Sequence, residues 1–200
     1  MISHKHKFIL ITPPKTGSTS LLKSLMKYCD IERINTQGGD VFDIIDEFKD
    51  ISPWLKKWGS KHITIREVQT GLNRVNKNIN DYIKIGVVRN PFDRVPAFWL
   101  RRKHLGMSLS QFTQTVKPCL HYLTAPNIRE MAMDHIIRFE NLQLDFNTIC
   151  DIIGLPHEKL AHINKLPHKH YSEYYDDEAR ELVAQQHAKD IEYFGYEYGK

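Results

Sequence analysis

Short apolar runs alternate with helical stretches along this chain. The continuous apolar run over 8–11 predicts a buried strand over 8–12, and a helical pattern of apolar positions follows over 18–28. Alternating apolar positions predict a second strand over 62–66, and a third strand is predicted over 82–88. Strands separated by helices are typical of βαβ units. The pattern therefore predicts an α/β fold with a central parallel β-sheet and helices on both faces.

Further elements are expected after the third strand. The carboxylate of Asp93 can cap a helix that has Pro96 in its first turn, where a missing N–H costs little. Gly154, with a proline two positions on, is a typical helix end. The other elements expected are a strand over 134–139, a helix over 141–153 and a last helix over 176–192.

The segment between the first two predicted strands gives weaker signals. Residues 35–40 contain paired glycines and are expected to form a loop. Short helical patterns follow over 41–48 and 53–58. The second of these places Trp54 and Trp58 one helical turn apart, either as an anchor on the sheet or as a platform for a sugar ring.

Composition agrees with a single globular domain over residues 1–200. With 41% hydrophobic and 26% charged residues, the chain can bury one core. Its net charge of +4 and isoelectric point near 8.8 suit a protein that binds small anions. The basic residues are dispersed along the chain, so nucleic-acid binding is not predicted.

Other features of the sequence argue against a metal site and a membrane-spanning segment. The three cysteines lie far apart and lack the spacing of a zinc site or a disulfide framework, and the histidines over 157–170 form no helical metal-binding pair. No apolar run is long enough to span a membrane, and residues 1–7 lack the apolar core of a signal peptide. We therefore expect a soluble cytoplasmic protein without metal or membrane span, and no pattern indicates an oligomeric state.

The most informative segment is the turn that follows the first strand. A strand that breaks through Pro and Gly into a helix points backbone N–H groups, hydroxyls and one lysine at a single place, which suits a phosphate or sulfate. The residues expected to bind the anion are Lys15, Thr16, Gly17, Ser18, Thr19 and Ser20. The triphosphate loop G-x-x-x-x-G-K-[ST] does not match, because Lys15 precedes Gly17. The turn therefore predicts a P-loop-like site in which the lysine approaches the anion from a different side than in the triphosphate loop.

A second anion site is expected at the end of the third strand. Arg89 stands there in an Arg-Asn-Pro sequence, immediately before the next predicted helix. A guanidinium can hold a phosphate through two parallel hydrogen bonds while the helix N-terminus faces the same anion. Two anion sites at two strand ends suit a ligand with an anionic group at each end of a ribose.

Both motifs resemble those of the sulfotransferases that use 3′-phosphoadenosine 5′-phosphosulfate (PAPS). In that family Pro-Lys-x-Gly-[Ser/Thr] binds the 5′-phosphosulfate, and Arg-[Asn/Asp]-Pro binds the 3′-phosphate. The second half of the chain looks like the carbohydrate branch of the family in the segments 137–142, 152–156, 164–165, 174–177 and 190–196. The likeness implies a sulfotransferase fold, PAPS as donor, adenosine 3′,5′-bisphosphate as product, no metal, and a hydroxyl acceptor on a carbohydrate rather than a small phenol.

One position departs from the family pattern. The family usually carries a serine eight residues after the motif arginine, where its hydroxyl binds the 3′-phosphate, and this chain has Ala97 there. Losing one charge-assisted hydrogen bond costs about 1.5 to 3 kcal/mol, roughly ten- to a hundredfold in affinity, unless other groups compensate. We therefore expect donor affinity to be the weak point of the resemblance.

Catalytic roles can be assigned on the same basis. An in-line displacement builds negative charge on the departing phosphate oxygen, and Lys15 is the candidate cation there. The acceptor hydroxyl needs a base. His62 stands where the related carbohydrate enzymes carry a histidine or glutamate base, and Glu67 is the second candidate. The family's closing segment, which covers the nucleotide, implies Lys165 as a further donor-binding residue.

Three alternatives remain open from the sequence. A phosphotransferase would bind ATP with magnesium, and the order of lysine and glycine speaks against it. A non-catalytic binding or regulatory module of the same fold is favoured by Ala97. A nucleic-acid binder needs a continuous basic face, which the sequence does not indicate. Arg66 and Arg94 are candidates for a phosphate contact or for a salt bridge.

Overall fold

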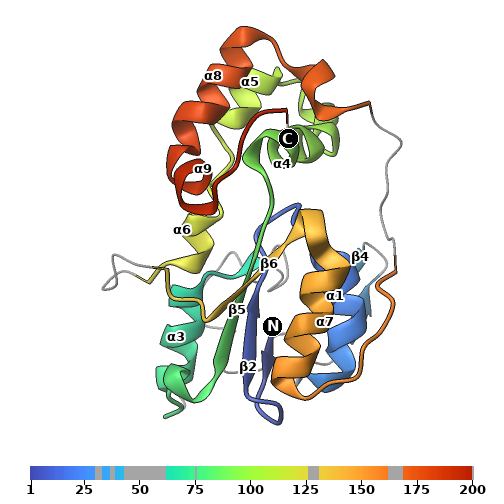
Figure 1. Cartoon of the computed structure of the whole chain (residues 1–200), viewed down its shortest axis with the longest axis vertical. Helices are drawn as coiled ribbons and strands as arrows, with labels where there is room; N and C mark the ends of the chain where they lie inside the picture. Colours follow the sequence, from blue (N-terminus) through green and yellow to red (C-terminus); the bar gives the residue numbers. More distant parts are fainter. Residues whose placement is uncertain are drawn as a thin grey trace.

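A four-stranded sheet forms the centre of the molecule (Figure 1). The computed structural model describes residues 1–29, 33–36, 39–42, 62–74, 76–125, 131–161 and 169–199, with the backbone alone for 33–36 and 39–42. The sheet has the order β1-β2-β5-β6, formed by β1 (Ile2–Ser3), β2 (Phe8–Ile11), β5 (Ile83–Val88) and β6 (His135–Arg138). Strands β2, β5 and β6 are parallel, as predicted, whereas the short edge strand β1 runs antiparallel to β2.

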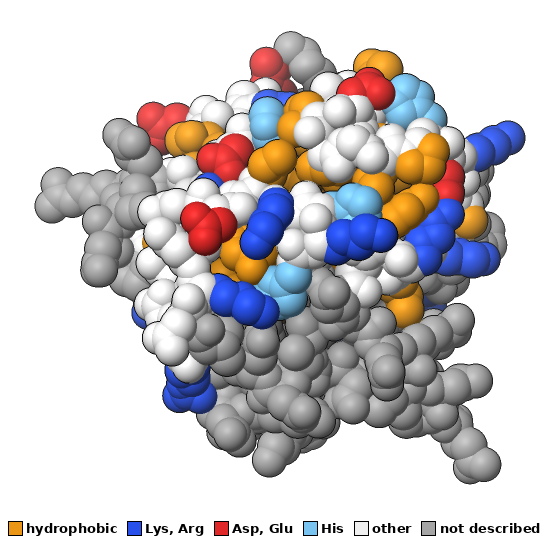
Figure 2. Space-filling view, turned by 90° about the horizontal axis from the view of Figure 1, so that it is seen from below, with side chains coloured by type: hydrophobic (Ala, Val, Ile, Leu, Met, Phe, Trp, Pro, Cys, Tyr) orange, Lys and Arg blue, Asp and Glu red, His pale blue; other side chains and the backbone are white. Residues whose placement is uncertain are grey.

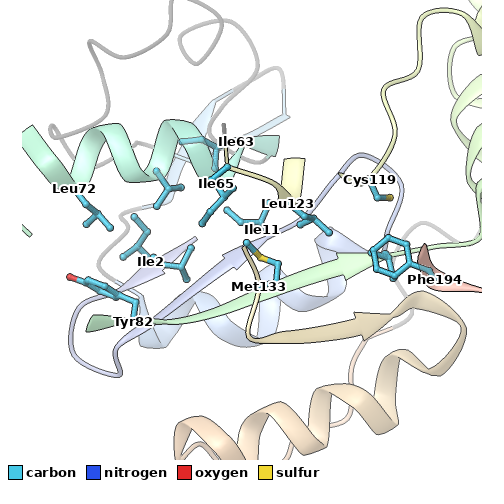
Figure 3. Packing of buried hydrophobic residues seen from close by; sticks show 14 of the residues in the cluster. Ile2, Ile11, Ile63, Ile65, Leu72, Tyr82, Cys119, Leu123, Met133 and Phe194 are labelled. Atoms are coloured by element: carbon cyan, nitrogen blue, oxygen red, sulfur yellow. The ribbon is translucent and has the colours of Figure 1, made fainter. Parts of the chain in front are cut away.

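Helices cover both faces of this sheet, which confirms the predicted α/β architecture. Successive side chains of β2 point to opposite faces, and all four residues of the strand are buried. Phe8 and Leu10 pack with α1 (Ser18–Leu25) and α7 (Leu142–Ile153). Ile9 and Ile11 pack on the other face with α3 (Ile65–Arg74) and α6 (Leu120–Leu123), as Figure 3 shows for Ile11, Ile65, Leu72 and Leu123.

A further group of helices lies beyond the carboxyl ends of the parallel strands (Figure 1). It comprises α4 (Pro91–Leu100), α5 (Leu109–Thr113), α8 (Asp177–Gln186) and α9 (Ala188–Phe194). Its core includes Val95, Phe112 and Val183, all buried. The carboxyl end of the sheet therefore faces a helical layer made from sequence-distant segments.

Short elements complete the fold. Within the described residues, the 3-10 helices are η1 (Met26–Tyr28), η4 (Ile79–Asp81), η5 (Lys103–Leu105), η6 (Phe139–Asn141) and η7 (Tyr171–Tyr174). A separate antiparallel hairpin is formed by β3 (Arg33–Thr36) and β4 (Gly39–Phe42). The prediction of a loop over 35–40 is therefore wrong at residues 35–36 and 39–40, which belong to the two strands. The helix predicted over 41–48 is wrong at Val41 and Phe42; its remainder and the one over 53–58, with Trp54 and Trp58, lie outside the described residues.

The strand predicted over 62–66 is wrong, because α3 begins at Ile65. Thr64 and Glu67 form a capping box: the Thr64 Oγ1 accepts the Glu67 N–H at 3.2 Å, and the Glu67 carboxylate accepts the Thr64 N–H at 2.8 Å. These bonds satisfy helix donors that have no acceptor inside the first turn. The sequence Thr-x-x-Glu was a readable helix signal that the alternating isoleucines obscured.

The start of α4 also differs from the prediction. The helix begins at Pro91, and the Asn90 side chain caps it by accepting the Phe92 N–H, so Asp93 is not the cap. Pro96 consequently lies inside the helix rather than in its first turn. A proline there leaves the carbonyl four residues back without its helical donor. The Tyr175 hydroxyl donates to this Phe92 carbonyl over 3.0 Å, which satisfies it from another segment.

The remaining helix predictions agree more closely with the structure. The expected helix over 18–28 is α1 continued by η1, and the helix expected over 141–153 is α7, which ends at Gly154 with a φ of 69°. The helix expected over 176–192 is divided in two, since His187 leaves the helical conformation with φ −107° and ψ 18°. Burial of the His187 ring accompanies this break.

The end of the molecule opposite the helical layer is mixed in charge. Figure 2 shows this end from below, where Lys, Arg and His side chains lie among acidic and hydrophobic ones. Two of the lysines near the amino ends of the strands are paired, Lys84 with Asp134 and Lys27 with Glu158. Across the parts that the structure describes, no helix has the length and apolar character needed to cross a lipid bilayer.

Candidate functional site

The loop between β2 and α1 has the conformation that an anion site needs. Gly17, the N-cap of α1, adopts the left-handed conformation with φ 83° and ψ 12°. A Cβ atom there would lie 3.0 Å from Leu142 Cδ2 and 3.1 Å from Phe139 Cδ2. Both the dihedral angle and the packing therefore require glycine. Beyond it, the first N–H groups of α1 have no acceptors inside the helix and carry its positive dipole end.

Lys15 is held in a strained conformation within this loop. Its φ is 68°, a left-handed value that costs a non-glycine residue about 1 to 2 kcal/mol. Such strain persists only where surrounding contacts fix the backbone. Here the Arg89 Nη1 donates to the Lys15 carbonyl over 2.9 Å, and the Thr16 Oγ1 donates to the Pro13 carbonyl over 2.8 Å. The strain therefore sits in the residue predicted to contact the reacting group.

Arg89 lies directly after β5 and is almost fully buried. Its Nε donates to Asp93 Oδ2 at 2.8 Å, its Nη2 pairs with the same oxygen at 2.7 Å, and its guanidinium lies 3.9 Å from the centroid of the Phe139 ring. These bonds and the one to the Lys15 carbonyl use three of its N–H groups. Both terminal nitrogens keep a second N–H, so Arg89 can join the two predicted anion motifs and still donate to a ligand.

The carboxyl half of the chain closes around the same strand end. The exposed Glu140 carboxylate accepts the Asn90 N–H over 2.6 Å, and the Tyr196 hydroxyl donates to that carboxylate over 3.4 Å. Burial, with the adjacent Glu140 charge, raises the pKa of Tyr196, which keeps the phenol protonated as a donor. The Asn90 side-chain amide donates to the Glu197 carbonyl over 2.9 Å. The three segments that resemble sulfotransferase motifs thus converge in space.

His62 is attached to the base of the anion loop. Its Nδ1 lies 2.7 Å from the carbonyl oxygen of Thr12, the residue that follows β2. A carbonyl accepts only, so Nδ1 carries the proton and, in the neutral ring, Nε2 carries the lone pair. Glu67, the alternative base, binds both the N–H and the hydroxyl of Thr64 at 2.8 Å. The structure thus brings His62 to the loop and gives Glu67 a capping role in α3.

The other predicted residues are placed as follows. Thr16, Ser18 and Ser20 are buried in and after the loop, and Thr19 is partly exposed. Ala97 is partly exposed on α4, whereas Lys165 lies outside the described residues. Sequence reasoning missed Asp93 and Glu140 as supports of the site. The spacing of Arg89 and Asp93, four residues apart at a helix start, was a usable signal, whereas Glu140 had none.

A comparison with protein-family models assigns the chain. The model described as the sulfotransferase family matches residues 1–108, more than half of the 200 residues. The chain belongs to the sulfotransferase family. The matched region contains the Lys15 loop, His62 and Arg89. No curated protein and no solved structure matches the chain.

Membership in the sulfotransferase family gives the site its general chemistry. The family transfers a sulfuryl group to a hydroxyl acceptor, and its central α/β fold agrees with the observed sheet and helices. Within the described residues, no group of three or more His, Cys, Asp or Glu side chains is arranged to hold a metal ion.

Proposed function

We propose that this sulfotransferase takes its sulfuryl group from PAPS and transfers it to a hydroxyl of a carbohydrate. The observation that carries the proposal is the hydrogen bond from the Arg89 guanidinium to the Lys15 carbonyl, which joins two basic motifs at neighbouring strand ends. PAPS has an anionic group on each side of its ribose. A phosphosulfate site and a phosphate site linked in this way match that ligand.

The loop residues suit the phosphosulfate end of PAPS. The amides from Thr16 to Thr19 lie at the N-terminus of α1, and the hydroxyls of Ser18 and Thr19 extend the same set of donors. Bound PAPS supplies the sulfuryl group and its leaving group, adenosine 3′,5′-bisphosphate. Lys15 would then face the leaving oxygen, where a cation stabilises the charge that develops during transfer.

The strand end of β5 suits the other phosphate. Arg89 retains N–H groups on both terminal nitrogens, and the N-terminus of α4 begins two residues later at Pro91. Lys165 is proposed as a contact from the closing segment, by resemblance to the family. Thus each end of the donor has its own set of positive groups.

His62 is the proposed general base. Its Nδ1–H is directed at the Thr12 carbonyl, so the neutral ring would accept the acceptor's hydroxyl proton at Nε2. The resulting imidazolium keeps the same bond to the Thr12 carbonyl, which then stabilises a positive ring. Glu67 serves this role less well, because its carboxylate already accepts two hydrogen bonds from Thr64.

A second candidate function is favoured by one specific observation. Ala97 lacks the hydroxyl that the family uses for the 3′-phosphate, so the protein can instead be a binding or regulatory module with weak or no transfer activity. Such a module binds nucleotide without turnover. Binding and transfer must therefore be measured separately.

Calorimetric titration with adenosine 3′,5′-bisphosphate, and separately with ATP and magnesium, tests the proposal. We expect binding of the bisphosphate and weaker or no binding of ATP. Absence of bisphosphate binding at millimolar ligand would refute the PAPS assignment, and preferential ATP binding would favour a phosphotransferase. If the bisphosphate binds, transfer of labelled sulfate from PAPS to a panel of oligosaccharides and phenols distinguishes the carbohydrate enzyme from a binding module.

A further inference from the structure

Three consecutive carbonyl groups of the anion loop, those of residues 13–15, each accept a hydrogen bond from a side chain. The bonds are Thr16 Oγ1 to the Pro13 oxygen at 2.8 Å, Arg94 Nη1 to the Pro14 oxygen at 3.4 Å, and Arg89 Nη1 to the Lys15 oxygen at 2.9 Å. Carbonyl oxygens repel an anion, whereas N–H groups attract it. Holding these oxygens on protein donors leaves the following amides to face the ligand.

Arg94 lies in the interior of the protein, without access to solvent. It is 0% exposed and is the largest fully buried side chain of the described residues. Besides the Pro14 carbonyl, it donates through Nη2 to the Lys117 carbonyl over 2.6 Å. A buried guanidinium is costly unless it is hydrogen-bonded and balanced by charge. Arg94 therefore connects the loop to a second backbone segment and cannot itself reach a ligand from the solvent side.

Asp190 supports that second segment from α9. Its carboxylate, also 0% exposed, accepts the Cys119 N–H at 2.5 Å and the Leu120 N–H at 3.0 Å, at the start of α6. Burial raises the pKa of Asp190, while these two N–H groups and the charge of Arg94 oppose the rise. The residues from Lys117 to Leu120 are thus held by a buried acid on one side and a buried base on the other.

We propose that Arg94 is a positioning residue of the transfer site: it fixes the Pro14 peptide and thereby orients the loop amides and Lys15 toward the donor. This inference rests on the proposed function, since the loop amides must be the donor's ligands. The support passes from Asp190 through the start of α6 to Arg94 and then to the loop. The anion loop is consequently held in shape by the helical layer beyond the sheet.

Arg94→Met and Arg94→Lys test the proposal. Methionine removes both hydrogen bonds, whereas lysine keeps the charge but has one nitrogen in place of the two that bind the Pro14 and Lys117 carbonyls. We expect Arg94→Met to weaken adenosine 3′,5′-bisphosphate binding at least tenfold and to reduce kcat for sulfate transfer, with Arg94→Lys intermediate in both. Val183→Ala is the matched control, because it also truncates a fully buried side chain of the helical layer but makes no contact with the loop carbonyls.

A role confined to stability predicts a different pattern. If Arg94 acted on stability alone, Arg94→Lys and Val183→Ala would lose the same affinity for the bisphosphate whenever their thermal unfolding midpoints are lowered equally. That result would overturn the proposal. Bisphosphate affinity within twofold of wild type in Arg94→Lys would overturn it as well.

Amide hydrogen exchange of the ligand-free protein separates this inference from the proposed function. We expect peptides covering residues 12–20 to exchange at least tenfold faster in Arg94→Lys, with peptides from α7 unchanged. Equal exchange of the loop in wild type and variant contradicts a positioning role. If wild type fails to bind the bisphosphate, the proposed function fails, and the exchange experiment still decides whether Arg94 fixes the loop.

Discussion

The Arg89 Nη1 donates a hydrogen bond to the carbonyl oxygen of Lys15 over 2.9 Å, although 74 residues separate the two along the chain. The bond crosses from the end of β5 to the loop after β2, two strands that are neighbours in the sheet. It holds Lys15 in a left-handed conformation with φ 68°. The two basic motifs of the sequence therefore form one unit, and changes in either are expected to affect both.

Replacing Lys15 should separate catalysis from stability. Lys15→Ala and Lys15→Gly both remove the cation, so we expect kcat for sulfate transfer to fall at least a hundredfold in each, since oxyanion-type stabilisation contributes on this scale. Glycine adopts φ 68° without strain, so Lys15→Gly should be more stable than Lys15→Ala by about 1 kcal/mol. Transfer assays with denaturant unfolding measure both effects. Transfer at the wild-type rate in either variant would refute the role of Lys15.

Gly17→Ala should damage the loop by crowding as well as by strain. The new Cβ would meet the Leu142 and Phe139 side chains at 3.0 and 3.1 Å. Gly106 is the matched control, because its φ is 68° and a Cβ there would have nothing within 4 Å. We expect Gly106→Ala to cost about 1 kcal/mol and Gly17→Ala about 2 kcal/mol or more, with loss of bisphosphate binding only in the latter. Equal unfolding free energies for the two variants would contradict crowding at Gly17.

His62→Asn should remove the base and keep the contact with the loop. The asparagine amide can replace the Nδ1–H that reaches the Thr12 carbonyl but cannot accept a proton. We expect kcat to fall by about a hundred- to ten-thousandfold with little change in KM for PAPS. Wild-type kcat should decline on acidification, because a protonated imidazole is no base, and this limb of the pH–rate profile should vanish in the variant. An unchanged acid limb would show that another residue is the base, and Glu67→Gln would be the next variant to test.

Ala97→Ser should strengthen donor binding if the 3′-phosphate lies beside α4. One new hydrogen bond to a phosphate contributes about 1.5 to 3 kcal/mol, so the affinity for adenosine 3′,5′-bisphosphate should rise roughly tenfold or more. Adenosine 5′-phosphate lacks the 3′-phosphate and is the control ligand, whose affinity should stay the same. Equal gains for both ligands in calorimetry would place the hydroxyl away from the 3′-phosphate.

His187 should make the protein less stable in acid. Burial and the nearby Arg94 charge lower the pKa of His187 from 6.5 to about 3. Between these two values the unfolded chain binds a proton that the folded protein does not, so the unfolding free energy falls as the pH decreases, by up to about 1.4 kcal/mol per pH unit.

His187→Leu isolates this contribution. We expect urea unfolding between pH 6 and pH 4 to show a shallower loss of stability in the variant than in wild type, because the leucine does not titrate. The neighbouring Asp190, whose pKa is raised by burial, is present in both proteins and cancels in the comparison. Parallel pH profiles for the two proteins would show that His187 does not remain neutral in the fold.

Local signals in the sequence were sufficient for much of the fold. The apolar runs in β2 and in residues 85–88 of β5 predict buried strands, because a strand covered on both faces need not alternate in polarity. The end of α7 at Gly154 follows from the freedom of glycine to adopt a positive φ. The wrong predictions also arose from local signals. The helix-cap signal of Thr64 competed with the alternating apolar positions that follow it, and the cap signal of Asn90 competed with that of Asp93.

The sequence by itself determined which groups are available at the site: a lysine, a glycine and hydroxyls after the first strand, and an arginine before the fourth helix. The tertiary structure alone decided what each of them contacts. Nothing local indicates that Arg89 holds the Lys15 carbonyl, that Arg94 is buried between Pro14 and Lys117, or that His62 reaches Thr12. These contacts join residues tens of positions apart. They form because a buried polar group costs free energy unless it is hydrogen-bonded, and only the fold brings these partners within reach.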